Sequence, residues 1–382
     1  MSKQKESKKP VIIVGVIAVV LLILFAACLA VPGFVNQQKK QLVAGYEKEM
    51  AAWEEEVAER TQAHNAEVSR LEAAASEGRS QDWPAHSAEG WDIVDLTGYA
   101  LENRYTESVS RQDVMNNGML LVNQWHSRPD DFQEAAITGV GNYANWKIPV
   151  SNASVSLFPV AIDALQEALT DATAAGMENY IVSEGYRSWD TQNASFQARK
   201  EKLASKYTDE AALIEATKKY VNYPGTSEFN SGLSFTLRLY KAGDAEISKP
   251  DYTTTPQGQW MSENCWKYGI VFRFPLPDFP MKGTMGKAHV TGVSTELNLY
   301  RYVGKAHATV MHLNDLCLEE YIEYLQQHPH IALFEDGTLK YEIYRQYVGD
   351  DSESFTLELT GNAVKAVSSM DNMGYVITAF EY

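Results

Sequence analysis

The side chains of this 382-residue chain best suited to bind a transition metal or to act as nucleophiles are eight histidines and three cysteines. No His-Glu-x-x-His motif occurs, and no pair among Cys28, Cys265 and Cys317 has zinc-finger spacing. His307 and His312 lie five residues apart, so they would not share a helix face as two ligands of one ion should. The spacing of these residues therefore predicts no common zinc motif.

Nucleophilic catalysis has no better support. The only Ser-x-x-Lys sequence is at residues 2–5, and no Lys-Thr-Gly follows it, so the penicillin-binding-protein motifs are missing. Residues 225–229 (GTSEF) lack the second glycine of a nucleophile elbow. Cys265 and Cys317 occur in apolar helical contexts, which favours buried, inert thiols. Whether these two cysteines form a disulfide cannot be read from the sequence.

Composition excludes several classes of protein. There are 33 Lys and Arg against 50 Asp and Glu, giving a formal net charge of -17, so the chain lacks the basic surface of a nucleic-acid binder. With 45% hydrophobic and 22% charged residues, most of the chain should fold. Three cysteines are too few for a disulfide scaffold.

Residues 11–35 predict one transmembrane helix, because an uncharged apolar run of about 20 residues spans the bilayer core. Four lysines precede it, so we expect residues 1–10 to form a cytoplasmic basic tail and the C-terminal domain to lie outside the plasma membrane. Signal-peptidase cleavage near Ala27 or Ala30 is an alternative, although the run is longer than a usual signal sequence. Lipidation of Cys28 is another, although apolar sequence continues past it.

Residues 36–80 are rich in Ala, Glu, Lys and Gln and predict a helical stalk. Its apolar residues at helical spacing are Leu42, Tyr46, Met50, Trp53 and Val57. A coiled coil that forms a homodimer and a solvated helical spacer both fit this short stripe. Residues 81–116, which begin in a Gly-, Pro- and Ser-containing stretch, predict a linker and an N-terminal extension.

The rest of the chain predicts an α+β fold, with helices and short strands in mixed order. Helices are expected at 158–176, 208–220, 261–268 and 308–327, the third closed by Gly269 and the fourth containing Cys317. Strands are expected at 119–122, 180–183 and 270–274. The β-rich C-terminal extension, 328–382, has four predicted strands, at 331–334, 339–344, 355–359 and 375–380.

Five segments in order, between residues 117 and 304, carry a family resemblance. They are 117–132 (NGMLLVNQWHSRPDDF), 185–192 (GYRSWDTQ), 224–237 (PGTSEFNSGLSFTL), 263–275 (ENCWKYGIVFRFP) and 291–304 (TGVSTELNLYRYVG). Together they resemble the zinc D-alanyl-D-alanine carboxypeptidases of the VanY type. The resemblance implies a carboxypeptidase-like core at 117–327, outside the membrane, whose relatives remove the terminal D-Ala from peptidoglycan stem peptides.

The departures from the family pattern concern the metal. The resemblance implies His, Asp and His as zinc ligands, but these positions hold Phe229, Thr236 and Leu299. Phe and Leu offer no lone pair, whereas catalytic zinc needs about three protein ligands. No cofactor is therefore predicted, and Glu296, at the family's general-base position, becomes a vestigial catalytic residue. A relocated metal site using His289, His307 or His312 is the alternative.

A ligand could still bind. The resemblance places Arg187, Ser188, Gln192 and Ser227 on the substrate side, where a guanidinium could pair bidentately with the C-terminal carboxylate of a peptide. Alternatively, these residues brace the core, with Arg187 paired to an acidic neighbour. The tryptophans at 189, 260 and 266 could line the cleft or belong to the core.

Three functions therefore fit the sequence. The first is a membrane-anchored, zinc-free pseudoenzyme that binds a stem peptide or a cell-wall protein. The second is an active, divergent D-Ala-D-Ala carboxypeptidase with an unrecognised metal arrangement. The third is a stalked interaction scaffold that docks to partners and has no peptide site.

Overall fold

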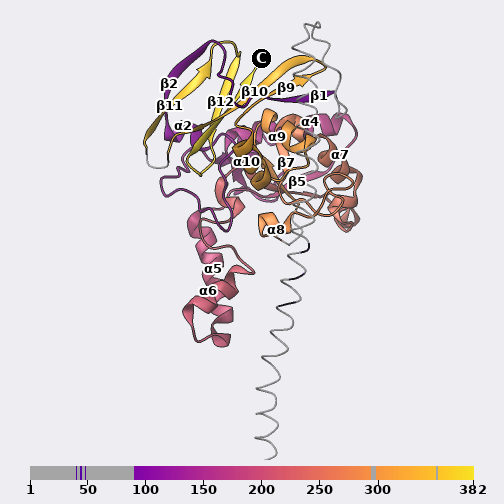
Figure 1. Cartoon of the computed structure of the whole chain (residues 1–382). Helices are drawn as coiled ribbons and strands as arrows, with labels where there is room; N and C mark the ends of the chain where they lie inside the picture. The colour runs from indigo at the N-terminus through magenta and orange to yellow at the C-terminus, as the bar shows by residue number, and fades with distance from the viewer. Residues whose placement is uncertain (1–39, 41–43, 45–47, 49–89, 294–297, 350–351) are drawn as a thin grey trace, which may run out of the picture. The chain divides into compact units, whose positions relative to one another are not determined.

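The computed structural model describes residues 90–293, 298–349 and 352–382, together with three helical positions, Lys40, Ala44 and Lys48 (Figure 1). The transmembrane helix expected at 11–35 and most of the stalk at 36–80 lie outside the described residues. Among the residues that are described, no helix is long and apolar enough to cross a membrane. The chain divides into two units, Met1–Asn65 and Ala66–Tyr382, and the second contains every strand and helix described below.

The centre of the second unit is a four-stranded antiparallel sheet. Its strands, in spatial order, are β5 (Tyr180–Glu184), β6 (Ser234–Leu239), β8 (Leu299–Tyr302) and β7 (Ile270–Phe272). Strands far apart in sequence are neighbours here, which is how the sheet gathers residues from several of the family-like segments. The mixed helix and strand fold predicted from the sequence is confirmed.

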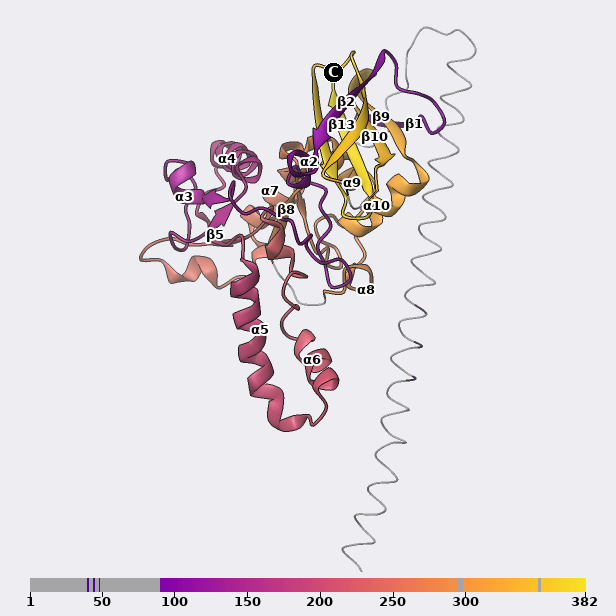
Figure 2. The same cartoon turned by 90° about the vertical axis from the view of Figure 1, so that its left-hand side faces the viewer.

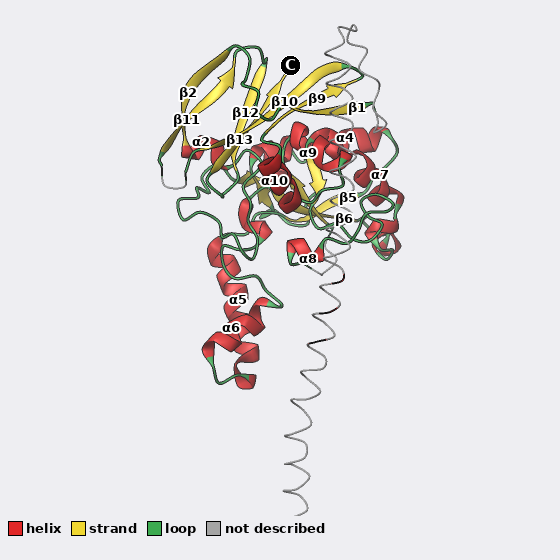
Figure 3. Cartoon of the chain, viewed as in Figure 1, coloured by secondary structure: helices red, strands yellow, loops and turns green. Residues whose placement is uncertain are grey.

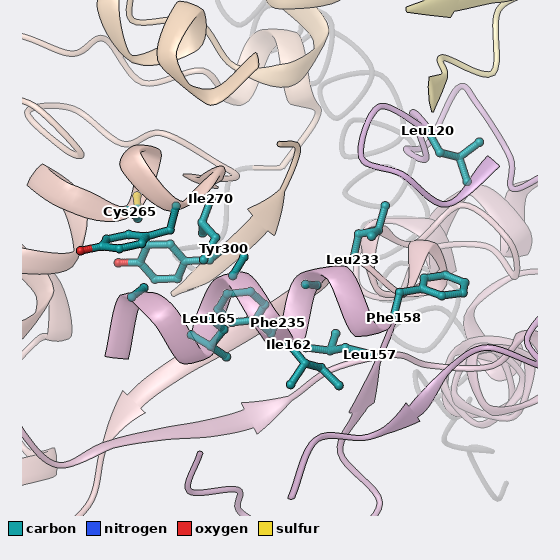
Figure 4. Close-up of a cluster of buried hydrophobic side chains, with 14 of the residues drawn as sticks. Leu120, Leu157, Phe158, Ile162, Leu165, Leu233, Phe235, Cys265, Ile270 and Tyr300 are labelled. Atoms are coloured by element: carbon teal, nitrogen blue, oxygen red, sulfur yellow. The ribbon is translucent and has the colours of Figure 1, made fainter. Parts of the chain in front are cut away.

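Helix α4 (Pro159–Ala174) supplies much of the apolar surface that packs on the central sheet. Pro159 occupies its first turn, where a missing N–H costs nothing, and Gly176 ends it with a φ of +80°. Its buried side chains include Ile162 and Leu165, which belong to the same cluster as Phe235 (Figure 4). The helix predicted at 158–176 is thus confirmed to within two residues at its end.

A second sheet combines one strand that precedes the central sheet in sequence with four strands that follow it. Its spatial order is β1 (Trp91–Asp95), β9 (His330–Glu335), β10 (Thr338–Tyr347), β13 (Tyr375–Glu381) and β12 (Lys365–Met370). A separate ladder pairs β2 (Arg104–Ser110) with β11 (Ser354–Thr360). Strands are thus present at all four positions predicted in the C-terminal extension, but β1, β2 and β12 were missed.

Two helices connect the sheets. They are α9 (Lys305–Leu313) and α10 (Leu318–Gln327), shown in red in Figure 3. Helix α9 contacts both β7 and β10. The single helix predicted at 308–327 is wrong. Asp315 has a left-handed φ of +50°, and the Leu316 N–H donates to the Met311 carbonyl at 2.8 Å, which is a Schellman ending, so the chain restarts as α10 after Cys317.

The remaining helices surround the central sheet. The two that form an arm projecting from the body are α5 (Trp189–Leu203) and α6 (Glu210–Lys218) (Figure 2). Helix α7 (Pro256–Asn264) continues into a 3₁₀ turn, Cys265–Tyr268, that Gly269 closes. The short elements are α2 (Arg111–Met115), β3 (Thr138–Gly139), α3 (Val140–Tyr143), β4 (Ser156–Leu157) and α8 (Ala288–Thr291).

One predicted strand is absent. Residues 119–122 are almost fully buried, as expected, but they are not part of either sheet. Their backbone is held from other segments instead, because the Met119 N–H donates to Ser369 Oγ at 2.8 Å and the Arg301 guanidinium donates to the Leu120 carbonyl at 2.9 Å. Burial was predictable from the apolar run, whereas the absence of a strand partner was not.

Candidate functional site

The three positions that the family resemblance assigns to zinc converge in the fold. The antiparallel pairing of β6 and β8 puts Thr236 directly opposite Leu299. Phe229 lies in the 3₁₀ turn Glu228–Ser231 just before β6, and it packs with Leu299 and Phe274 in one small apolar cluster. Val293 packs against this cluster from the segment that follows α8. We call Phe229, Phe274 and Leu299 the apolar plug.

The residues of this centre do not fit zinc. Phe229 and Leu299 carry no donor atom, and the Thr236 hydroxyl is already hydrogen-bonded to Ser183 Oγ at 2.7 Å. Within the described parts of the chain, no group of three or more His, Cys, Asp or Glu side chains is arranged to hold a metal ion. Glu296, the residue at the family's general-base position, lies outside the described residues.

The histidines considered for a relocated metal site serve other contacts. His307 is buried in α9 with its Nδ1 2.8 Å from the Tyr321 hydroxyl, and burial lowers the pKa of His307 to about 3. The ring of His312 stacks on Trp266, with centroids 4.5 Å apart. His289 belongs to the short helix α8. These three histidines therefore do not form a metal-binding group.

Next to the apolar plug lies a buried network of four charged side chains. Glu228 accepts hydrogen bonds from Arg301, from Ser234 Oγ at 2.6 Å, and from Arg273 Nε at 2.8 Å. Arg273 also makes a bidentate pair with Glu319, at 2.8 and 2.7 Å. Two guanidinium groups thus balance two carboxylates, the arrangement that buried charges require.

The network shifts the acidity of Glu228. Burial alone would raise the pKa of Glu228, but the positive charges of Arg273 and Arg301 and the hydrogen bonds from Ser234 and Arg301 lower it to about 2. A carboxylate with a depressed pKa and no exposed face is a poor proton acceptor. Glu228 is therefore a structural anion of the core.

Arg301 extends the network to another segment. Its Nη2 donates to the carbonyls of Gly118 and Leu120, at 2.6 and 2.9 Å. The family-like residues Glu228 and Arg301 thus join three segments that are far apart in sequence. Sequence reasoning noted both residues as matches to the family but missed Arg273 and Glu319, because nothing in their local sequence shows that they meet Glu228.

Arg187 lies in the short segment between β5 and α5, and its guanidinium group contacts several side chains. It pairs with Glu184, donates from Nη1 to Gln192 Oε1 at 2.8 Å, and lies over the Phe229 ring at 4.7 Å from the ring centroid. Gln192 is itself fixed, because its Nε2 donates to the Asn222 carbonyl at 2.7 Å. The fold therefore brings Arg187 and Gln192 against the apolar plug.

Ser188 and Ser227 occupy turn positions beside Arg187. Ser188 caps α5, accepting from the Thr191 N–H at 3.1 Å, and Ser227 caps the turn that carries Phe229. The two segments are tied together, because the Arg187 N–H donates to the Phe229 carbonyl at 3.0 Å and Asn230 Nδ2 donates to the Arg187 carbonyl at 2.5 Å. The four residues proposed for substrate binding thus lie on two adjoining segments.

The remaining candidate residues have different surroundings. Trp189 is exposed at the start of α5, whereas Trp260 packs against the core and Trp266 is buried. Cys265 and Cys317 are both buried and free, so they do not pair. Burial raises the pKa of the Cys265 thiol to about 12, which makes it inert as a nucleophile.

This part of the chain is similar in sequence to known proteins. Residues 154–305 match the family model described as VanY, D-alanyl-D-alanine carboxypeptidase. A D-alanyl-D-alanine carboxypeptidase of Enterococcus faecium is 26% identical over 284 residues, covering 73% of this chain and 80% of the relative. One of Enterococcus faecalis is 34% identical over 222 residues, covering 58% and 71%.

A solved structure shares the fold. It is the vancomycin-resistance D,D-dipeptidase VanXYg in complex with a D-Ala-D-Ala phosphinate analog, which aligns with a TM-score of 0.53 at 22% identity over 73% of this chain and 99% of that one. The identity to the Enterococcus faecalis enzyme extends across more than two thirds of that relative. This chain therefore belongs to the VanY family of D-alanyl-D-alanine carboxypeptidases.

Proposed function

We propose that this chain is a zinc-free pseudoenzyme of the VanY family that binds peptidoglycan stem peptides without cleaving them. The observation that carries the proposal is the apolar plug, where Phe229 and Leu299 pack together at two of the positions that the family pattern gives to zinc ligands. The third such position, Thr236, is paired with Leu299 across the sheet. We infer that packing has replaced coordination at this centre.

Peptide hydrolysis is expected to be lost with the metal. Zinc lowers the pKa of its bound water from about 15.7 to about 7, which corresponds to roughly 12 kcal/mol toward hydroxide formation. A general base alone contributes about 10²- to 10⁴-fold, or roughly 3 to 5 kcal/mol. Glu228 cannot supply even that, because it is buried between Arg273 and Arg301.

Binding, by contrast, has a plausible anchor in Arg187. Its partner Glu184 is 43% exposed in its side chain, and ion pairs at such positions contribute only about 0 to 1 kcal/mol. The carboxylate at the end of a peptide could replace Glu184, while Gln192 and the Phe229 ring keep the guanidinium in place. Glu184 would then act as an internal stand-in for the ligand.

The location of this domain is part of the proposal. An apolar run at 11–35 preceded by four lysines supports a single-pass anchor in the plasma membrane, with the VanY-like domain outside the cell. The Glu- and Lys-rich residues 36–80 would hold the domain away from the bilayer. Peptidoglycan stem peptides are then within reach, and so are cell-wall proteins.

The test combines binding and cleavage by the purified full chain in detergent. Calorimetric titration with a pentapeptide ending in D-Ala-D-Ala should show binding that Arg187→Ala removes and Glu184→Gln strengthens. Prolonged incubation should release no D-Ala, with the Enterococcus faecium relative as the active control. Release that stops when a chelator is added would contradict the proposal.

An active carboxypeptidase remains the second candidate, and the 34% identity to the Enterococcus faecalis enzyme favours it. That reading requires D-Ala release in the same assay. The third function, docking to partners without a peptide site, requires a flat titration for the unmodified chain together with no release. The two readouts thus separate all three functions.

A further inference from the structure

Two exposed tryptophans lie beside the candidate site. The exposed fraction is 57% for Trp125 and 43% for Trp189, which is high for the largest aromatic side chain. Indole rings carry a large apolar face and favour binding surfaces over bare solvent exposure. Each ring lies near a residue that contacts the apolar plug. Trp189 is two residues after Arg187, which lies over the Phe229 ring, and Trp125 lies beside Gly292, which precedes Val293.

Trp189 stands on the Arg187 side. It is the first residue of α5, directly after the cap Ser188 and two residues after Arg187. A Cβ atom added to Gly225 would lie 3.6 Å from Trp189 Cδ1, so the indole lies against the segment that leads to Ser227 and Phe229. The ring thus borders the guanidinium proposed to bind the peptide carboxylate.

Trp125 stands on the α8 side. A Cβ atom added to Gly292 would lie 3.1 Å from Trp125 Cη2, and the next residue, Val293, packs on the apolar plug. Figure 2 shows the segment that follows α2 running beside α8. Trp125 was not singled out in the sequence, where it appears as one aromatic residue in a polar stretch.

The backbone that carries Trp125 is held firmly. Asn123 Oδ1 accepts from the N–H groups of Trp125 and His126, each at 3.0 Å, and Asn123 Nδ2 donates to Glu319 of the buried network. The two sides are also joined, because the N–H of Arg128 donates to the Gly225 carbonyl at 2.7 Å. A rim that is fixed before binding loses little entropy when a ligand arrives.

We propose that Trp125 and Trp189 are ligand-binding residues that hold the D-Ala-D-Ala end of a stem peptide over the apolar plug. The inference rests on the proposed function, which places the peptide carboxylate at Arg187. Apart from that carboxylate, the D-Ala-D-Ala end presents methyl groups and peptide planes. The faces of the two exposed indole rings match those methyl groups and peptide planes.

The experiment is a calorimetric titration of the full chain with a pentapeptide ending in D-Ala-D-Ala. Trp125→Ala and Trp189→Ala should each weaken binding about tenfold, as loss of an aromatic anchor does. Trp146→Ala is the matched control, because Trp146 is 61% exposed and follows α3, and its affinity should stay within about twofold of the unmodified chain. Trp125→Phe and Trp189→Phe should keep most of the affinity, which separates a lost contact from a lost fold.

The outcomes distinguish this inference from the proposed function. If the unmodified chain binds the peptide and both alanine variants bind equally well, the tryptophan inference is overturned while the proposed function stands. If the unmodified chain gives no heat, both are overturned. If Trp125→Ala weakens binding no more than Trp146→Ala does, the ligand does not reach the α8 side, and the inference fails for Trp125.

Discussion

At the scale of single residues, Glu228 and Arg301 show how a family motif can persist for structural reasons. Both are fully buried, and they pair with each other and with Arg273 and Glu319. In the absence of water, the opposite charges stabilise one another, so the loss of one side chain leaves a buried charge without its partner. Buried ion pairing is therefore a sufficient structural reason for the presence of these two motif residues.

Replacing Glu228 by Gln should destabilise the fold strongly. Removing one partner of a buried ion pair leaves an unpaired buried charge, which costs about 3 to 5 kcal/mol. Urea denaturation of the full chain, followed by tryptophan fluorescence, would measure the free energy of unfolding. Glu215→Gln is the control, because Glu215 pairs with Lys218 at an exposed site and its loss should cost at most about 1 kcal/mol.

The same carboxylate predicts a pH dependence. The pKa of Glu228 is lowered from 4.5 to about 2 in the folded chain, so the unfolded chain binds this proton first as pH falls. The stabilisation is fully present above about pH 4.5 and declines as pH falls toward 2. The gap in unfolding free energy between the unmodified chain and Glu228→Gln should therefore narrow over that interval. A gap that is constant from pH 6 to pH 2.5 would show that folding does not lower the pKa of Glu228.

The proposed loss of zinc can be examined by restoring the ligands. The variant with Phe229→His, Thr236→Asp and Leu299→His should bind zinc, because β6–β8 pairing and the apolar plug bring these positions together. Competition with a colorimetric chelator would measure the affinity. The double variant that keeps Leu299 is the control and should bind more weakly. A triple variant that folds, by circular dichroism, yet binds no zinc would mean that these positions are not the ligand positions.

Sequence reasoning went furthest where a residue could be read from a contiguous motif. Phe229, Thr236, Leu299 and Arg187 were located by their places in family-like segments, and the fold brings all four to one centre. The partners of these residues could not be read in this way. Arg273 and Trp125 take part through tertiary contacts that no local pattern records. The pair of Arg187 with Glu184 is local, and it matches the alternative in which an acidic neighbour braces Arg187.

At the scale of elements, glycines fix where helices end. Gly176 and Gly269 both follow helical segments with a φ near +80°, but their surroundings differ. Nothing lies within 4 Å of a Cβ added to Gly176, whereas one added to Gly269 would lie 2.7 Å from the carbonyl carbon of Gly304. The turn at Gly269 therefore serves both as a helix end and as the point where α9 approaches β7.

These two glycines give a matched pair of variants. Gly176→Ala should cost about 1 to 2 kcal/mol, the price of a left-handed backbone with a Cβ. Gly269→Ala should cost about 1 to 3 kcal/mol more, because the added carbon overlaps a backbone that cannot give way. Thermal and urea unfolding would measure both. Equal effects would show that the segment at Gly304 relaxes freely.

Elements with a regular apolar pattern were predicted well, and others were not. Helix α4 and the strands β9 and β10 bury one face or both, so their apolar residues recur at the spacing typical of a helix or a strand. Helix α5 was missed because only Gln192, Phe196 and Leu203 of its residues are buried, as befits an arm that projects from the body. The polar strand β12 (KAVSSM) is likewise defined by its pairing with β13.

At the scale of the whole second unit, the family core is enclosed by segments from both sides of it in sequence. β1 pairs with β9, and β2 pairs with β11, so residues 91–110 and 330–381 fold together. Apolar side chains of β1, β9, β10 and β13 pack with those of α9 and α10 in a shared cluster. The sequence predicted two separate extensions, and their union could not be foreseen because it depends on pairing across more than 200 residues.

The proposal that this domain lacks zinc rests on a few residues of its core. Glu228, Arg273, Arg301 and Glu319 form a complete buried charge network, and Phe229 and Leu299 pack together at two of the positions that the family resemblance assigns to zinc ligands. The most direct measurement is the zinc content of the full chain, purified without chelators and analysed by inductively coupled plasma mass spectrometry. We expect well under 0.1 zinc per chain, whereas a catalytic zinc site that is filled holds about one. A stoichiometric zinc ion in the purified chain would contradict the proposal.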